Sequence, residues 1–165
     1  MALFDFLFKK QNADESAAVN RWVCENFREI LVQHDGKHIV YSFQQATVTY
    51  RHVISSRDGG RSFPAGYLDA RTRTLPAKAQ GQVLAPIVAA LSSLPFFDGL
   101  EILPPGASHS ALMIVTRADG TRIYYSNCHC DGFSVRRDPI EPSFLAVFQA
   151  LSRFCDFPSL PGQGR

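Results

Sequence analysis

The hydrophobic positions after residue 16 recur at steps of three and four, which is the period of an amphipathic helix. The residues that keep this spacing are Val19, Trp22, Val23, Phe27, Ile30 and Leu31. The polar stretch 11–16 precedes them and suits a helix start. We therefore predict a helix that ends near Gly36, where a left-handed cap fits. A rival interpretation is a hairpin over residues 29–43, because Asp35-Gly36 also suits a tight turn. The helical spacing up to Leu31 favours the first.

From His38 to about Ala70 the pattern changes to β-branched and aromatic residues, which are typical of strands. We predict strands at 38–43, 47–55 and 63–70, with a turn at 55–62. One face of the second strand then carries Val48, Tyr50, His52 and Ile54. Pro64 favours an edge position for the third. Residues 71–81 are predicted to form a connecting loop.

The second half of the chain predicts a helix, a hairpin and a last helix. The apolar positions at 82–94 have helical spacing, and Pro86 is tolerated if it lies in the first turn. Residues 100–103 predict a short strand. The apolar and aromatic residues at 111–130 predict a central hairpin that turns at Asp119-Gly120. A final helix is predicted within 138–155, with Pro142 near its start.

These elements predict an α+β fold, a mainly antiparallel β-sheet packed with about three α-helices in a single compact domain over residues 13–157. A short amphipathic segment at 1–12 is expected to dock its aromatic residues on the domain or on a partner. Residues 158–165 are expected to form a flexible tail. No stretch of ~20 apolar residues predicts a membrane span. Residues 1–10 lack the order of a secretory signal, which predicts a cytoplasmic protein.

The sequence Cys128-His129-Cys130 raises the question of a metal site. In an extended strand the two thiols share one side and His129 points to the other. Structural zinc favours four ligands and a turn-forming C-x-x-C pair. We therefore predict no metal and no cofactor, with the thiols packed as small hydrophobic side chains, as also for Cys155. Two alternatives stay open: an enzyme of unrecognised type with a Cys/His site around Cys128–Cys130, and a zinc-binding domain.

The formal charge of +2 is too small to favour nucleic acid as a partner. Between Arg51 and Lys78, however, six basic residues accompany only two acidic ones. The arginines of this region predicted to bind a partner are Arg51, Arg57, Arg61, Arg71 and Arg73. They could steer an acidic protein towards the chain, although a solvated strand edge carries such charges equally well.

Common catalytic motifs are absent from the sequence, among them G-x-S-x-G, H-E-x-x-H and G-x-x-x-x-G-K-[ST]. We therefore hypothesise a non-catalytic protein-binding module of a bacterial inhibitor or immunity type. Such a protein blocks a partner protein, for example a toxin or an enzyme.

Overall fold

The computed structural model describes residues 13–52, 70–99, 103–104 and 109–157, with side chains described from residue 17 onwards. The helices of this part are α2 (Ala13–Asn26), α3 (Ala77–Ser93) and α4 (Pro142–Ser152). The strands are β1 (Phe27–His34), β2 (Lys37–Ser42), β3 (Thr47–His52), β4 (Arg71–Thr74), β5 (Phe97–Asp98), β6 (Ala111–Arg117), β7 (Arg122–Ser126), β8 (Cys128–Asp131) and β9 (Ser134–Arg137).

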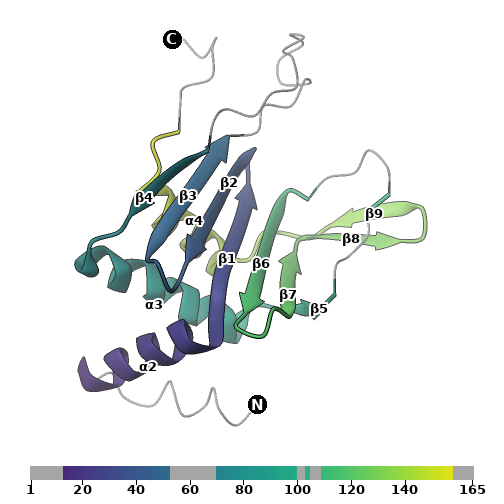
Figure 1. The fold of residues 1–165 in the computed structure, drawn as a ribbon. Coiled ribbons are helices and arrows are strands. Elements are labelled where there is room, and N and C mark those ends of the chain that lie inside the picture. Colours follow the sequence, from purple (N-terminus) through teal and green to yellow (C-terminus); the bar gives the residue numbers. More distant parts are fainter. Residues whose placement is uncertain (1–12, 53–69, 100–102, 105–108, 158–165) are drawn as a thin grey trace.

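Seven of these strands form one sheet in the order β4-β3-β2-β1-β6-β7-β5, and β8 pairs with β9 in a separate ribbon. Every pair is antiparallel. Helices α3 and α4 cover one face of the large sheet, while no helix of the described part covers the other (Figure 1). The ribbon projects beyond β7 (Figure 1). The predicted α+β class with a mainly antiparallel sheet is therefore confirmed.

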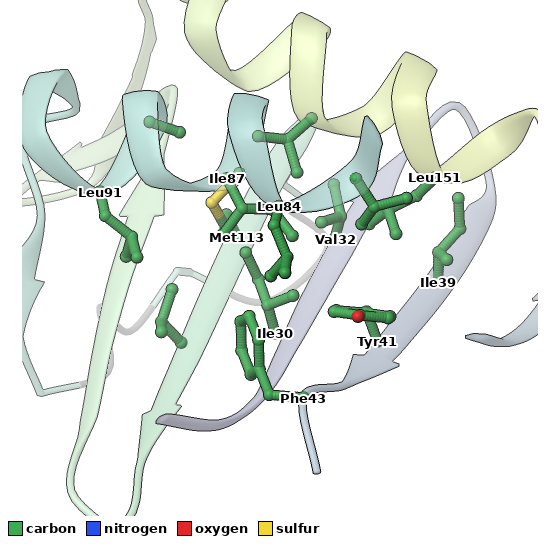
Figure 2. Close-up of a cluster of buried hydrophobic side chains, with 14 of the residues drawn as sticks. Ile30, Val32, Ile39, Tyr41, Phe43, Leu84, Ile87, Leu91, Met113 and Leu151 are labelled. Atoms are coloured by element: carbon green, nitrogen blue, oxygen red, sulfur yellow. The ribbon is translucent and has the colours of Figure 1, made fainter. Parts of the chain in front are cut away.

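The hydrophobic core lies between the sheet and helices α3 and α4 (Figure 2). Alternate strand residues point into it, because side chains along a strand face opposite sides in turn. The sheet contributes Ile30, Val32, Ile39, Tyr41, Val48 and Met113, and the helices contribute Val83, Ile87, Phe144 and Leu151, all at most 1% exposed. Along each strand, the residues next to these core residues therefore point to the other face of the sheet.

The predicted helix over residues 16–35 is wrong beyond Asn26. The chain leaves α2 and enters β1 at Phe27, and the rival hairpin is the one that forms. Asp35 and Gly36 make its turn with positive φ angles of 50° and 67°, as a two-residue hairpin turn requires. Ile30 and Val32 alternate into the core, so pairing with β2 and β6 prevails over the helical spacing.

The predicted loop at 71–81 is also wrong, because Arg71–Thr74 form β4 and α3 begins at Ala77. Pro86 lies inside α3 and not in its first turn. A proline there removes one intrahelical hydrogen bond. Buried Val83 and Ile87 flank it in the core and offset this loss.

The predicted hairpin at 111–130 is confirmed in part. Strands β6 and β7 pair around Asp119-Gly120, and the Asp119 carboxylate accepts a hydrogen bond from the Thr121 backbone N–H at 2.8 Å. The strand ends at Ser126, however, and the chain passes into the separate β8–β9 ribbon. Helix α4 is confirmed, with Pro142 in its first turn.

Some predictions fall outside the described residues. They concern the N-terminal segment 1–12, the tail 158–165, and the strands predicted at 63–70 and 100–103. Only the last residue of each predicted strand is described, and neither is in a strand.

Candidate partner-binding site

Three of the five predicted arginines lie on two neighbouring strands. Arg71 and Arg73 lie on edge strand β4, opposite Tyr50 and Val48 of β3. Paired residues of antiparallel strands share a face, so both arginines project on the helix-covered side, at the exposed border of the sheet. Arg51 lies near the end of β3 on the opposite face. Arg57 and Arg61 lie outside the described residues.

Lys37 joins these arginines, although it was not predicted as a site residue. It is the first residue of β2 and pairs with His52 of β3. Its place depends on the hairpin at Asp35-Gly36, which was the less favoured interpretation of the sequence. We call Lys37, Arg51, Arg71 and Arg73 the basic edge.

The basic edge affects the pKa of His38, because His38 pairs with Arg51 across β2 and β3. Burial is the main reason that the pKa of His38 is lowered, and the positive charge of Arg51 lowers it further. Two described carboxylates adjoin these elements: Asp35 lies in the β1–β2 turn just before Lys37, and Asp156 follows α4. Of these two carboxylates, Asp156 pairs with a cation of the basic edge, Arg73.

One carboxylate is already bound at the basic edge. Arg73 forms an ion pair with Asp156, in which both side chains are largely exposed. Next to Asp156, the ring of Phe157 lies 5.3 Å from Lys37 Nζ, a cation–π distance. The edge thus already makes both kinds of contact that a cationic surface offers to a protein, one with a carboxylate and one with an aromatic ring.

Cys155 lies beside this contact and is a partly buried thiol packed against the core, as predicted. Burial raises the pKa of Cys155 to about 12; Arg73 lowers it and Asp156 raises it to smaller extents. The thiol therefore stays protonated near neutral pH, which does not suit a nucleophile.

The Cys128-His129-Cys130 segment lies on β8, away from the basic edge (Figure 1). Cys128 is fully buried, and the Cys130 thiol donates a hydrogen bond to the Gly132 carbonyl at 3.2 Å. His129 projects from the other side of β8, where its Nε2 lies 3.2 Å from a carboxylate oxygen of Asp138. The strand alternation predicted for these three residues is confirmed within β8, and it separates the imidazole from the two thiols.

Asn127 is the junction between β7 and the ribbon, a role that the sequence analysis missed. Its side-chain oxygen accepts hydrogen bonds from Ser110 Oγ at 2.7 Å and from the Ala111 N–H at 2.9 Å. Its amide donates to the Asp138 carbonyl at 3.0 Å. With only 4% of Asn127 exposed, these bonds anchor the base of the ribbon to the large sheet.

A serine–histidine pair lies beside this junction. Ser126 Oγ is 2.6 Å from His109 Nδ1, a distance found in pairs that activate a nucleophile. Ser126 is only 1% exposed, however, and its oxygen also accepts a hydrogen bond from the Cys128 N–H at 3.0 Å. The hydroxyl is thus engaged in the turn between β7 and β8 and is closed to a substrate.

No group of three or more His, Cys, Asp and Glu residues within the described ranges is placed to hold a metal ion. In the same part of the chain, no helix has both the length and the apolar character needed to cross a membrane. A polar hollow of about 320 Å³ opens on the helix-free face of the sheet. Its lining includes Arg28, Glu29, Ser42, Gln44 and Thr47, and it lacks the cysteines and histidines considered above.

Comparisons with protein-family models, with curated proteins and with solved structures give no match. The function is therefore argued from the geometry of the chain itself.

Proposed function

We propose that this protein is a non-catalytic binding module that holds another protein at its basic edge. In this proposal the partner presents an acidic surface, and the bound module blocks it in the manner of a bacterial inhibitor or immunity protein. In this proposal the module acts in the reducing cytoplasm, where cysteines are kept mainly as thiols.

The observation that carries the proposal is that Lys37, Arg51 and Arg71 lie at the same end of three adjacent strands, with Lys37 and Arg71 on the helix-covered face and Arg51 on the other. The pairs Lys37–His52 and Tyr50–Arg71 fix this arrangement. Arg73 extends it along the edge and already binds a carboxylate. Guanidinium groups at a sheet border can pair with carboxylates in two-point contacts, and their joint field speeds the approach of an acidic partner.

The alternatives from the sequence have less support in the geometry. A Cys/His enzyme needs a thiol within reach of a base, whereas His129 projects from the opposite side of β8 to Cys128 and Cys130 and faces Asp138. A zinc site needs four ligands around one ion, and the same separation of side chains opposes it.

Charge reversal at the basic edge tests the proposal. Wild-type protein, the double variant Arg71→Glu/Arg73→Glu and the matched control Arg117→Glu/Arg122→Glu are used to capture partners from native lysate, followed by quantitative mass spectrometry. The control makes the same charge change at two exposed arginines of the β6–β7 hairpin. Each captured protein is then purified and titrated by calorimetry at rising salt concentration.

We expect one partner to bind the wild type and the control, to lose binding to the edge variant, and to bind more weakly as salt rises. All three proteins should show the same far-ultraviolet circular dichroism. A partner that binds the edge variant with wild-type affinity, or the absence of any stoichiometric partner, would overturn the proposal.

A further inference from the structure

The chain after α4 turns back onto the basic edge. Backbone hydrogen bonds from Phe154 to Leu151 and from Cys155 to Ser152 form this turn, and Asp156 and Phe157 then reach β3 and β4. Figure 1 shows this segment, in yellow, leaving α4 beside β4. We call Asp156-Phe157 the internal ligand.

The internal ligand makes two kinds of contact at once. The Asp156 carboxylate pairs with Arg73, while the Phe157 ring packs edge-on against Tyr50 at 5.3 Å between ring centroids. The same ring approaches Lys37 Nζ at 5.3 Å. Strand pairing brings these contacts together, because Lys37 faces His52 and Tyr50 faces Arg71 on the helix-covered side. The site therefore combines a cation for a carboxylate with an aromatic and cationic seat for a ring.

These contacts suit a ligand that can leave. The Arg73 and Asp156 side chains are 47% and 65% exposed, and ion pairs with such exposure are weak in water. The internal ligand lies outside α4 and outside every strand, so its release would break no hydrogen bond of the helix or the sheet.

His52 indicates that the seat beneath Phe157 is incompletely satisfied. The imidazole is 8% exposed and lies 6.1 Å from the Phe157 ring centroid. Its Nδ1 is buried and has no hydrogen-bond partner among the described residues. Buried polar atoms are rarely left so, and a bound segment that brings a backbone N–H or a hydroxyl group to this nitrogen would supply the missing bond. Phe157 offers it only a ring.

We infer that the internal ligand occupies the place of a partner segment, and that the basic edge recognises a carboxylate-bearing residue next to an aromatic one. The partner is a protein with an exposed Asp or Glu beside Phe, Tyr or Trp, and it displaces Asp156-Phe157 on binding. This inference rests on the proposed function and adds the chemistry of the partner and a self-occupied resting state.

Binding of a peptide in trans tests the inference. The probe is a fluorescein-labelled peptide that copies residues 153–158, with serine in place of the cysteine, and the readout is fluorescence anisotropy. The full-length proteins compared are the wild type, the opened variant Asp156→Asn/Phe157→Ala, and the opened variant carrying Arg73→Gln. The matched control adds Arg137→Gln to the opened variant, because Arg137 lies on the distant ribbon.

If the internal ligand occupies the site in about nine molecules of ten, its removal should tighten the apparent Kd of the probe about tenfold. Arg73→Gln should abolish this gain, whereas Arg137→Gln should preserve it. A probe with Asn-Ala in place of Asp-Phe should bind none of these proteins.

The inference is overturned if the opened variant binds the probe no more tightly than the wild type, or binds the Asn-Ala probe equally well. Should thermal unfolding show that the opened variant does not fold, the single variant Asp156→Asn takes its place and must show the same direction of change. Loss of the peptide effect with edge-dependent capture retained would overturn only this inference. If the Arg71→Glu/Arg73→Glu variant captures the partner as well as the wild type does, the proposed function is overturned instead.

Discussion

Replacing Asn127 with alanine should destabilise the whole fold, because this side chain joins the ribbon to the large sheet. Its amide group makes three hydrogen bonds with nitrogen and oxygen atoms, to Ser110 Oγ, the Ala111 N–H and the Asp138 carbonyl, at 2.7 to 3.0 Å, and its oxygen also accepts a longer bond from Cys128 Sγ at 3.7 Å. The Ala111 N–H is at the start of β6 in the core of the sheet, where Ala111 is fully buried. Alanine leaves these groups without this partner, and the bond lost by the Ala111 N–H is buried while the other two are partly buried.

The size of the effect follows from the number of bonds lost. Each buried hydrogen bond contributes about 1 kcal/mol to stability, and each stranded buried group costs about 1–3 kcal/mol. Three bonds therefore predict that Asn127→Ala lowers the free energy of unfolding by about 3 kcal/mol. With a urea dependence of ~2 kcal/mol/M, the midpoint should fall by about 1.5 M.

Equilibrium urea unfolding measures this change through far-ultraviolet circular dichroism and through the fluorescence of Trp22, the single tryptophan. The matched control is Asn26→Ala, which removes one exposed hydrogen bond, from Asn26 Nδ2 to the Trp22 carbonyl at 2.8 Å. The control should shift stability by less than about 1 kcal/mol. If Asn127→Ala is no more destabilising than the control, the junction is not anchored by this amide.

Two further predictions concern titration and reactivity. Burial raises the pKa of Tyr41 to about 12, with a smaller effect of Cys24 in the same direction, so between about pH 10 and 12 the phenol is mainly neutral in the folded state and mainly ionised in the unfolded state. The free energy of unfolding should hold below about pH 10, where the unfolded tyrosine titrates, and should fall as the pH rises towards 12. Between pH 9 and pH 11, the decrease in this free energy should be about 1.4 kcal/mol smaller in Tyr41→Phe than in the wild type. Equal decreases in the two proteins would contradict the assignment. In native protein treated with iodoacetamide, peptide mass spectrometry should find Cys130 alkylated first and fully buried Cys128 last. Cys24 and Cys155 should react more slowly than Cys130, because burial raises the pKa of both thiols, that of Cys155 to about 12. Equal labelling of Cys128 and Cys130 would show that β8 does not bury one thiol and expose the other.

The sequence predicted the class of fold well but misassigned the first long element. Phe27, Ile30 and Leu31 fit a helical period, yet Ile30 and Val32 fit the period of a strand equally well. The choice depends on β6, which pairs with β1 through residues about 80 positions later in the chain. A local pattern does not contain that partner. The structure decides by burying Ile30 and Val32 and leaving Leu31 on the helix-free face.

The candidate site shows the opposite situation, in which the right residues were assigned to the wrong element. Arg71 and Arg73 were predicted to bind a partner from a loop, but they lie on strand β4. An edge strand with sequence Arg-Thr-Arg-Thr has no apolar alternation to reveal it. Its pairing with β3, supported by a hydrogen bond between Thr49 and Thr72 at 2.9 Å, becomes visible only when the strands are placed side by side.

The polar residues at Ser126-Asn127 were a signal that the sequence analysis passed over. Two polar side chains interrupt an otherwise apolar and aromatic run, and a buried polar side chain requires partners. Such a pair predicts either a bend or a hydrogen-bonded junction. The partner Ser110 precedes Asn127 in the chain and the partner Asp138 follows it. The sequence alone therefore does not show that the two meet at Asn127.

The solvated-edge interpretation of the basic residues explains their charge but only part of their surroundings. Charged side chains on a short edge strand prevent unwanted pairing with other chains, and β4 fits that role whether or not a partner exists. A purely protective edge, however, does not require the Phe157 ring to lie against Tyr50 and Lys37. Nor does it explain why His52 Nδ1, close to that ring, is buried with no hydrogen-bond partner within the described part of the chain. The inferred site, in which Asp156-Phe157 holds the place of a partner segment, would account for the charge, the ring and the unsatisfied nitrogen together.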